Sequence, residues 1–306
     1  MSKTLKPIIG IRVIKFFYII GWIIKYSIKH KINPAILSRL NPELPNGGKC
    51  TLSKSYIYEY FTQNNSTAKK YFAEYIRIPK DTSWNKTKIL IKKFDNKKIV
   101  LKPDKGIRST GVMATNSENK IRQLLDAAKT DYLIQEYIDY KYELGVFYYK
   151  YPTWKNGKIL GIAERTFEEI VDPHDTEQYT NRSDLITPYV TEVFNKIVGN
   201  KKIYFCRFDV RAKNLEEFKK GQFKILEANA GPDAVALHAL DKTYTRKKQL
   251  KLYSEEYVHA FNIANTVEIH KNKPKANLIK YFWFMIKDDL PLRLLNYRTR
   301  KIINNK

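Results

Sequence analysis

Apolar and polar residues alternate along residues 203–212. Successive side chains of a strand point to opposite faces, so Cys206 and Phe208 lie on one face while Arg207 and Asp209 lie on the other. A second β-patterned segment follows after a polar stretch that ends in a lysine-lysine-glycine turn. Together the two segments predict a β-hairpin.

On the second strand, Glu227 and Asn229 are predicted to share a face with Ile225. Pairing of the strands brings these two polar residues beside Asp209 and Arg207. Carboxylate and amide oxygens suit Mg²⁺, which takes one or two carboxylates and leaves its other positions to water and phosphate oxygens. The hairpin therefore predicts a magnesium site. The alternative is a solvated hairpin that carries scattered charges.

The rest of the pattern predicts a mixed α and β chain. Helical spacing covers residues 53–61 and 66–76, and a buried strand covers residues 99–101. Thr115 and Glu118 form a capping box that predicts the start of a further helix. Strands are predicted over residues 132–138, 144–151 and 158–164, with an Asn-Gly turn before the last.

Composition restricts the function classes. A chain of 306 residues holds one large or two modest domains with a substantial core. Its two cysteines form no motif, which indicates neither a zinc site nor a disulfide framework. The net charge of +25 favours anionic partners, such as lipid surfaces, nucleic acid or phosphorylated substrates. Compositional drift towards lysine, isoleucine and asparagine is the alternative explanation of that charge. No nucleic-acid-binding motif accompanies it.

The N-terminal stretch is the most apolar part of the chain, but basic residues interrupt it. At helical spacing Arg12, Lys15, Lys25 and Lys29 fall within one arc, and apolar residues cover most of the rest. This pattern is typical of an interfacial helix on an anionic membrane. The C-terminal stretch has the same aromatic and basic character. The alternative for both ends is that they pack on the core.

A phosphate-binding loop is predicted after the strand at residues 99–101. That strand ends in Lys102, and the segment DKGIRSTGV follows. Backbone amides and hydroxyl groups of such a loop can hold phosphate oxygens beside a lysine. It is not a Walker loop, because no Gly-Lys-Ser/Thr follows at the required spacing.

Four motifs in one order resemble the ATP-grasp superfamily. They are VLKPDKGIRSTGV, YLIQEYIDYKYELGVF, RFDVR and LEANAGP. The closest likeness is to the branch that contains D-alanine–D-alanine ligase, with the sugar-transfer or cell-envelope associated ATP-grasp proteins as an alternative. The resemblance implies an α+β ATP-grasp fold, in which two α+β subdomains grip ATP, here behind a truncated N-terminal pre-grasp region.

The same resemblance implies a domain organisation. A basic amphipathic segment covers residues 1–50, and the ATP-grasp domain covers residues 51–270 with a lid subdomain at about 90–140. A basic aromatic tail covers residues 271–306.

The resemblance also implies roles for individual residues. Lys102, and more weakly Lys54, match lysines that contact the nucleotide phosphates. Glu143 matches the acid that holds the ribose hydroxyls, and Arg207 matches the catalytic arginine that stabilises charge at the reacting carboxyl centre. The remaining matches are the loop over the phosphates (Ser109, Thr110, Gly111), the adenine-reading linker (Gln135, Glu136, Tyr137, Ile138) and the metal ligands (Asp209, Glu227, Asn229).

The implied activity is an amide ligation that uses ATP and two Mg²⁺ ions and passes through an acylphosphate. Its partners are a small-molecule or lipid-linked carboxylate and an amine, on a cell-envelope or polysaccharide precursor. The expected location is cytoplasmic, peripheral on the inner face of the membrane. Two alternatives remain: an ATP-grasp kinase that phosphorylates a hydroxyl, and a non-catalytic basic protein that binds membrane or nucleic acid.

Some residues depart from the family pattern or match no motif. The segment LEANAGPDA stands where peptide ligases have Pro-Gly after the asparagine, so the sequence does not support D-alanine as the substrate. Arg165 and Arg182 are predicted to be solvated surface residues, with binding of a carboxylate as the alternative. His174 and His238 are predicted to be structural or exposed.

Overall fold

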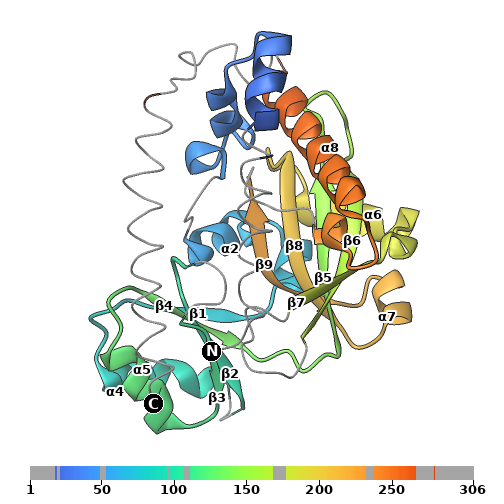
Figure 1. Ribbon diagram of the computed structural model, residues 1–306. Helices are drawn as coiled ribbons and strands as arrows, with labels where there is room; N and C mark the ends of the chain where they lie inside the picture. The colour runs from blue at the N-terminus through green and yellow to red at the C-terminus, as the bar shows by residue number, and fades with distance from the viewer. Residues whose placement is uncertain are drawn as a thin grey trace, which may run out of the picture.

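Two antiparallel sheets organise the chain in the computed structural model (Figure 1). The structure describes residues 18, 21–48, 53–94, 97–106, 111–167, 177–231, 237–266 and 279. One sheet has four strands and the other has five, and helices pack on both. The predicted α+β class is therefore confirmed.

The smaller sheet has the strand order β1-β4-β2-β3. Its strands are β1 (Tyr75–Ile78), β2 (Ile99–Pro103), β3 (Met113–Thr115) and β4 (Tyr132–Glu136). The helices α4 (Trp84–Ile91) and α5 (Glu118–Asp126) pack against it, and the short helix η3 (Lys92–Phe94) follows α4. Leu101, Ile134 and Ile121 are buried in its core. The predicted lid at about 90–140 spans β2 to β4, and β1 joins the same sheet from earlier in the chain.

The larger sheet has the strand order β7-β6-β5-β8-β9. Its strands are β5 (Tyr142–Tyr149), β6 (Lys158–Phe167), β7 (Glu177–Asn181), β8 (Phe205–Ala212) and β9 (Lys224–Ala230). The helices on its main core are α2 (Lys54–Thr62), α3 (Ser66–Tyr71), α6 (Pro188–Val198) and α7 (Leu215–Lys219). Phe61, Phe194 and Phe208 pack together at the centre of that core.

A second core lies against α8 (Arg246–Ala264), where Phe147, Phe205 and Phe261 are buried. Short helices complete the structure: η1 (Pro34–Arg39), η2 (Pro45–Gly48), η4 (Ser183–Leu185) and η5 (Leu237–Leu240).

The predicted hairpin is present, but with a bulge. Strands β8 and β9 pair, and α7 lies in their connection. Asp209 pairs with Glu227, whereas the next residue, Val210, pairs with Ile225. Leu226 is therefore an extra residue, and such a bulge reverses the face of the residues beyond it. For this reason the predicted common face of Ile225 and Glu227 was wrong, and Ile225 is fully buried in the core.

Two local predictions were also wrong. The helix predicted over residues 66–76 ends at Tyr71, because Phe72 turns to extended backbone and forms a bridge to Ile225. The cap of α5 is Ser117, whose side chain accepts from the backbone N–H of Lys120, while Thr115 belongs to β3.

Residues 21–30 form a helix whose inner face packs on α8. Trp22 and Tyr26 stack on each other, and both lie against Phe261. The Tyr26 hydroxyl also donates to Asn262 Oδ1 at 3.1 Å. The core-packing alternative thus holds for this face, whereas the opposite face is exposed at residues 24, 25, 28 and 29. Arg12, Lys15 and nearly all of the C-terminal tail lie outside the described residues.

Within the described part of the chain, no helix combines the length and apolarity needed to cross a bilayer.

Gly161 on β6 allows η5 to approach the sheet. A Cβ at this position would lie 2.4 Å from Cγ and Nδ1 of the buried His238 ring. We expect Gly161→Ala to lower the free energy of unfolding by about 1–3 kcal/mol through overpacking, measured by urea denaturation. Gly21→Ala is the matched control, because a Cβ on this helical glycine meets nothing within 4 Å. Equal stability of the two variants would contradict the close approach.

Candidate nucleotide and metal site

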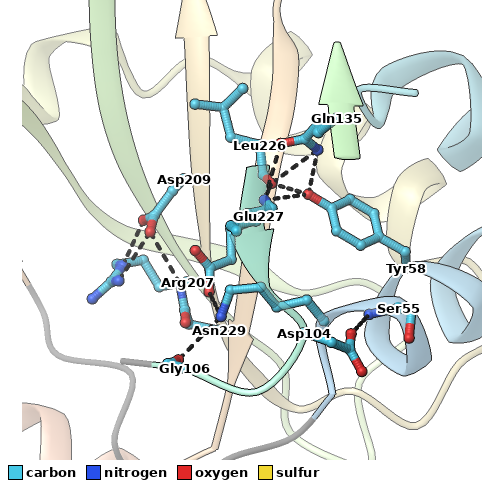
Figure 2. Close-up of polar contacts among 12 residues, drawn as sticks. Ser55, Tyr58, Asp104, Gly106, Gln135, Arg207, Asp209, Leu226, Glu227 and Asn229 are labelled. Atoms are coloured by element: carbon cyan, nitrogen blue, oxygen red, sulfur yellow. Dashed lines mark hydrogen bonds and ion pairs between the residues drawn. The ribbon is translucent and has the colours of Figure 1, made fainter. Parts of the chain in front are cut away.

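The bulge on β9 creates a polar junction between the two sheets. Leu226 has no register partner, and its carbonyl accepts from Lys102 Nζ at 2.9 Å, from Gln135 Nε2 at 3.3 Å and from the Tyr58 hydroxyl. These donors come from β2, β4 and α2. Figure 2 shows Gln135 and Tyr58 converging on the Leu226 carbonyl. A single backbone oxygen of the larger sheet therefore anchors the smaller sheet.

Lys102 is almost fully buried at this junction, with 5% of its surface exposed. Its ammonium has three N–H donors, and they reach Leu226 O, Gln135 Oε1 at 2.9 Å and the Tyr58 hydroxyl at 3.2 Å. Burial lowers the pKa of Lys102, and the nearby charges of Glu227 and Asp209 oppose that effect. A phosphate oxygen that binds Lys102 would replace one of its three acceptors.

Lys54 is the first residue of α2, and Asp104 holds the start of that helix. Asp104 Oδ1 accepts from the backbone N–H of Ser55 at 2.8 Å, and its carbonyl accepts from that of Lys54 at 2.8 Å. Anchored in this way, Lys54 Nζ lies 3.1 Å from Glu227 Oε1 and donates to Gly106 O at 3.1 Å. The end of β2 thus places a second ammonium beside β9.

Glu227 is ionised between these lysines. Burial disfavours its charged form, but the charges of Lys54 and Lys102 outweigh burial and lower the pKa of Glu227. Its carboxylate lies one residue beyond the Leu226 carbonyl, so the same backbone bulge places both acceptors.

Asp209 and Asn229 complete the polar surface of β8 and β9. Arg207 donates to Asp209 through Nε at 2.7 Å and Nη2 at 3.0 Å, and Asn229 Nδ2 donates at 3.0 Å. Burial raises the pKa of Asp209 although the Arg207 charge lowers it. Because Asn229 donates through its nitrogen, its Oδ1 remains an oxygen that a cation can use.

The predicted metal ligands therefore lie together, as register partners and neighbours on adjacent strands. Across the ranges that the structure describes, no group of three or more His, Cys, Asp or Glu side chains is arranged to hold a metal. Two carboxylates and one amide nevertheless fit Mg²⁺, which fills its other positions with water and phosphate oxygens. Their role as ligands stays a prediction.

The predicted ribose acid, Glu143, lies between two arginines. Its Oε1 accepts from Arg165 Nη1 at 2.9 Å, and its Oε2 accepts from Arg211 Nη2 at 3.1 Å. Arg165 is 20% exposed, so its prediction as a solvated residue was wrong. The same holds for Arg182, which pairs with Glu164 at 2.7 Å.

The side chains of the predicted linker each make a different contact within the protein. Gln135 binds Lys102, while Glu136 Oε1 accepts from the backbone N–H of Glu74 at 2.9 Å. The Tyr137 ring lies under Lys98 Nζ, 4.2 Å from the ring centroid, and Ile138 is buried. Adenine reading by the backbone of this linker stays a prediction.

The structure describes the predicted phosphate-binding loop only in part. Gly111 has φ +75°, and a Cβ there would lie 2.9 Å from Pro103 Cγ, so the position requires glycine. Ser109 and Thr110 lie outside the described residues.

Sequence reasoning missed Tyr58, Asp104, Arg211 and the Leu226 carbonyl. Tyr58 lies one helical turn after Lys54, and that spacing is the one signal that links it to the site. The Leu226 carbonyl is a backbone group that lacks a strand partner because of the bulge, so no residue type in the sequence marks it.

Comparisons with known proteins give structural likeness alone. No protein-family model and no curated protein matches the chain. A D-alanine–D-alanine ligase from Bacillus anthracis complexed with ATP is 15% identical, with 72% of this chain and 68% of that chain covered and a TM-score of 0.47. D-alanyl-alanine synthetase A from Vibrio cholerae is 16% identical, with 71% of this chain and 66% of that chain covered and a TM-score of 0.47.

The ATP-grasp ligase PsnB, complexed with its minimal precursor, is 11% identical, with 67% of this chain and 60% of that chain covered and a TM-score of 0.43. This chain thus spans about two thirds of the length of the three proteins.

The buried His238 makes the free energy of unfolding depend on pH. Its ring is buried over Gly161, and its Nδ1 has no hydrogen-bond partner within the described part of the chain. Burial lowers the pKa of His238 to about 4. Between pH 6.5 and 4 the unfolded chain therefore binds the proton more readily, and the free energy of unfolding falls as the pH falls through this window, by about 3 kcal/mol in full.

Urea denaturation at pH 7 and pH 4 measures this loss. We expect His238→Gln to lose about 3 kcal/mol less than the wild type between the two pH values. The exposed His30→Gln serves as the control and should lose as much as the wild type. Identical losses in wild type and His238→Gln would contradict the burial of a neutral imidazole.

Proposed function

We propose that this chain is an ATP-grasp enzyme, an ATP- and Mg²⁺-dependent ligase that joins a carboxylate to an amine. One observation carries the proposal: where the two sheets join, two lysines and one arginine contact two carboxylates and a backbone carbonyl, namely Lys54 with Glu227, Lys102 with Leu226 O and Arg207 with Asp209. Phosphates need such cations, and a magnesium ion needs such oxygens. The contacts supporting the proposal are those of Lys54, Lys102 and Arg207 with β8 and β9.

The residues divide between holding the nucleotide and holding the metal. Asp209, Glu227 and Asn229 would hold Mg²⁺, which when bound neutralises phosphate charge. Lys102 and Lys54 bind phosphate oxygens. In doing so, Lys102 exchanges one of its present acceptors, and Lys54 turns from Glu227 towards the nucleotide. Because the site is largely buried, each charge acts more strongly than it would in water.

The reaction proceeds in two displacements. A carboxylate oxygen of the substrate attacks the γ-phosphorus of ATP, the bond to the β-phosphate oxygen breaks, and ADP leaves. The amine nitrogen then attacks the acyl carbon, phosphate leaves with the bonding electron pair, and the proton lost by the nitrogen passes to the departing phosphate. Arg207 stabilises the negative charge that develops on the carbonyl oxygen.

Glu227→Gln separates the charge of this carboxylate from its size. We expect the variant to fold and to lose about 10²–10³-fold in turnover, because it keeps the shape but not the charge that faces the cation and the phosphates. Steady-state ADP release measures turnover. The control is Glu216→Gln, whose carboxylate is 73% exposed on α7. Wild-type turnover of the Glu227 variant would refute its role.

Measuring ADP and free phosphate in one assay identifies the reaction class. The protein is incubated with ATP, Mg²⁺ and a panel of acids and amines. A ligase releases ADP and phosphate in equal amounts, and only when acid and amine are both present. ADP without free phosphate would instead identify a kinase. Neither product with any pair would favour the non-catalytic alternative.

We also propose that the acceptor is a cell-envelope or polysaccharide precursor, lipid-linked and reached at an anionic membrane surface. The support is the exposed face of the helix at residues 21–30, opposite its contact with α8. That face presents Ile24 and Ile28, which are 52% and 73% exposed, beside Lys25 and Lys29. Apolar insertion and lysine attraction to anionic lipid act together on such a face.

Vesicle sedimentation tests this attachment with the full chain. We expect binding to phosphatidylserine-containing vesicles at low salt and not to neutral vesicles. Replacing both Lys25 and Lys29 by glutamine should weaken binding about 30-fold, since each lysine contributes about 1 kcal/mol near the surface. Lys86 and Lys120, exposed on the smaller subdomain, provide the matched double control. If the Lys25/Lys29 variant binds these vesicles as the wild type does, the helix at residues 21–30 does not attach the protein to the membrane.

A further inference from the structure

We infer that Arg211 is a positioning residue, which fixes the adenine-reading linker relative to the ribose-holding carboxylate. The inference rests on the proposed function, because it assigns a task within the nucleotide site. Arg211 is the last residue of the RFDVR motif, but the resemblance assigned it no role.

The guanidinium of Arg211 joins two elements. Nη1 donates to Ile138 O at 2.9 Å, while Nη2 and Nε donate to Glu143 Oε2 at 3.1 and 3.3 Å. Arg211 is the register partner of Glu143 across β5 and β8, so the sheet itself sets this pairing. The side chain is 24% exposed, which makes these bonds only partly screened by water.

The bond between Arg211 and Ile138 O ties the linker between the two sheets to the larger sheet. Ile138 lies in the connection between β4 of the smaller sheet and β5 of the larger sheet. Glu143 lies near the start of β5. A planar guanidinium offers donors in a fixed fork, so one side chain sets the distance between the linker backbone and the carboxylate. Lysine keeps the charge but cannot reproduce that fork.

Arg165 supplies the comparison. Its Nη1 donates to the other carboxylate oxygen, Glu143 Oε1, at 2.9 Å. Oε2 of Glu143 thus accepts both Arg211 bonds, while Oε1 accepts the Arg165 bond and retains a lone pair for a ribose hydroxyl. Both arginines orient the carboxylate, whereas the contact with Ile138 O belongs to Arg211. Arg165→Lys therefore perturbs the carboxylate and leaves the Arg211 bond to the linker in place.

Calorimetric titration with two ligands tests the inference. Magnesium ADP reports on base, ribose and phosphates, and magnesium tripolyphosphate reports on phosphates alone. We expect Arg211→Lys to weaken ADP binding about 10- to 100-fold, the usual range for losing charged hydrogen bonds, and to bind tripolyphosphate as the wild type does. Arg165→Lys should weaken ADP binding less. Arg211→Gln is the second variant if the lysine variant does not fold.

The possible outcomes separate this inference from the proposed function. If the wild type binds ADP and both Arg211 variants bind it equally well, the positioning role is wrong while the nucleotide site stands. An equal loss of ADP and tripolyphosphate would also overturn the role, because it indicates general damage to the site. A wild type that does not bind ADP would overturn both proposals.

Discussion

The carbonyl oxygen of Leu226 is the contact on which the arrangement of this protein depends. It is free because one extra residue interrupts the β8–β9 ladder, and a buried carbonyl without a partner is costly. Lys102, Tyr58 and Gln135 satisfy it from three elements outside the larger sheet. Separating the two sheets would leave these donors and the carbonyl unpaired. The cost of doing so fixes the position of one sheet relative to the other. Where the sheets meet, phosphates would be bound.

Charge balance explains how so polar a junction stays folded. Lys54 and Lys102 face Glu227, and Arg207 faces Asp209, so no described member of this cluster is buried without an opposite charge. The opposing pKa shifts follow from this balance: lysine charges lower the pKa of Glu227, while burial raises that of Asp209. A bound nucleotide and metal ion bring negative and positive charge together. The nucleotide phosphates can therefore replace the carboxylates as partners of the basic residues, and the metal ion can replace the basic residues as partner of the carboxylates. No charged group of the cluster is then left without an opposite charge.

Basic residues serve two different purposes in this chain. The buried Lys102 and the partly buried Arg207 belong to the junction, where Lys102 donates to neutral oxygens and Arg207 pairs with Asp209. Exposed basic residues, such as Lys25 and Lys29, lie beside apolar side chains on the outer face of a helix whose inner face is fixed to α8. A net charge of +25 is therefore a sum over unlike environments, and it does not by itself identify a partner.

The sequence alone determined the hairpin, the common face of Arg207, Asp209, Glu227 and Asn229, and the strand that carries Lys102 near its end. Each depends on alternation or on residues close in the chain, where backbone geometry leaves few choices. Tertiary structure decided the bulge at Leu226, the end of α3 at Tyr71, and the pairing of Glu143 with two arginines. An extra residue in a strand has no local signature, because its cost is met by donors more than a hundred residues away in Lys102 and Tyr58. Alternation therefore predicts which side chains face the site, whereas packing between distant segments decides what each of them binds.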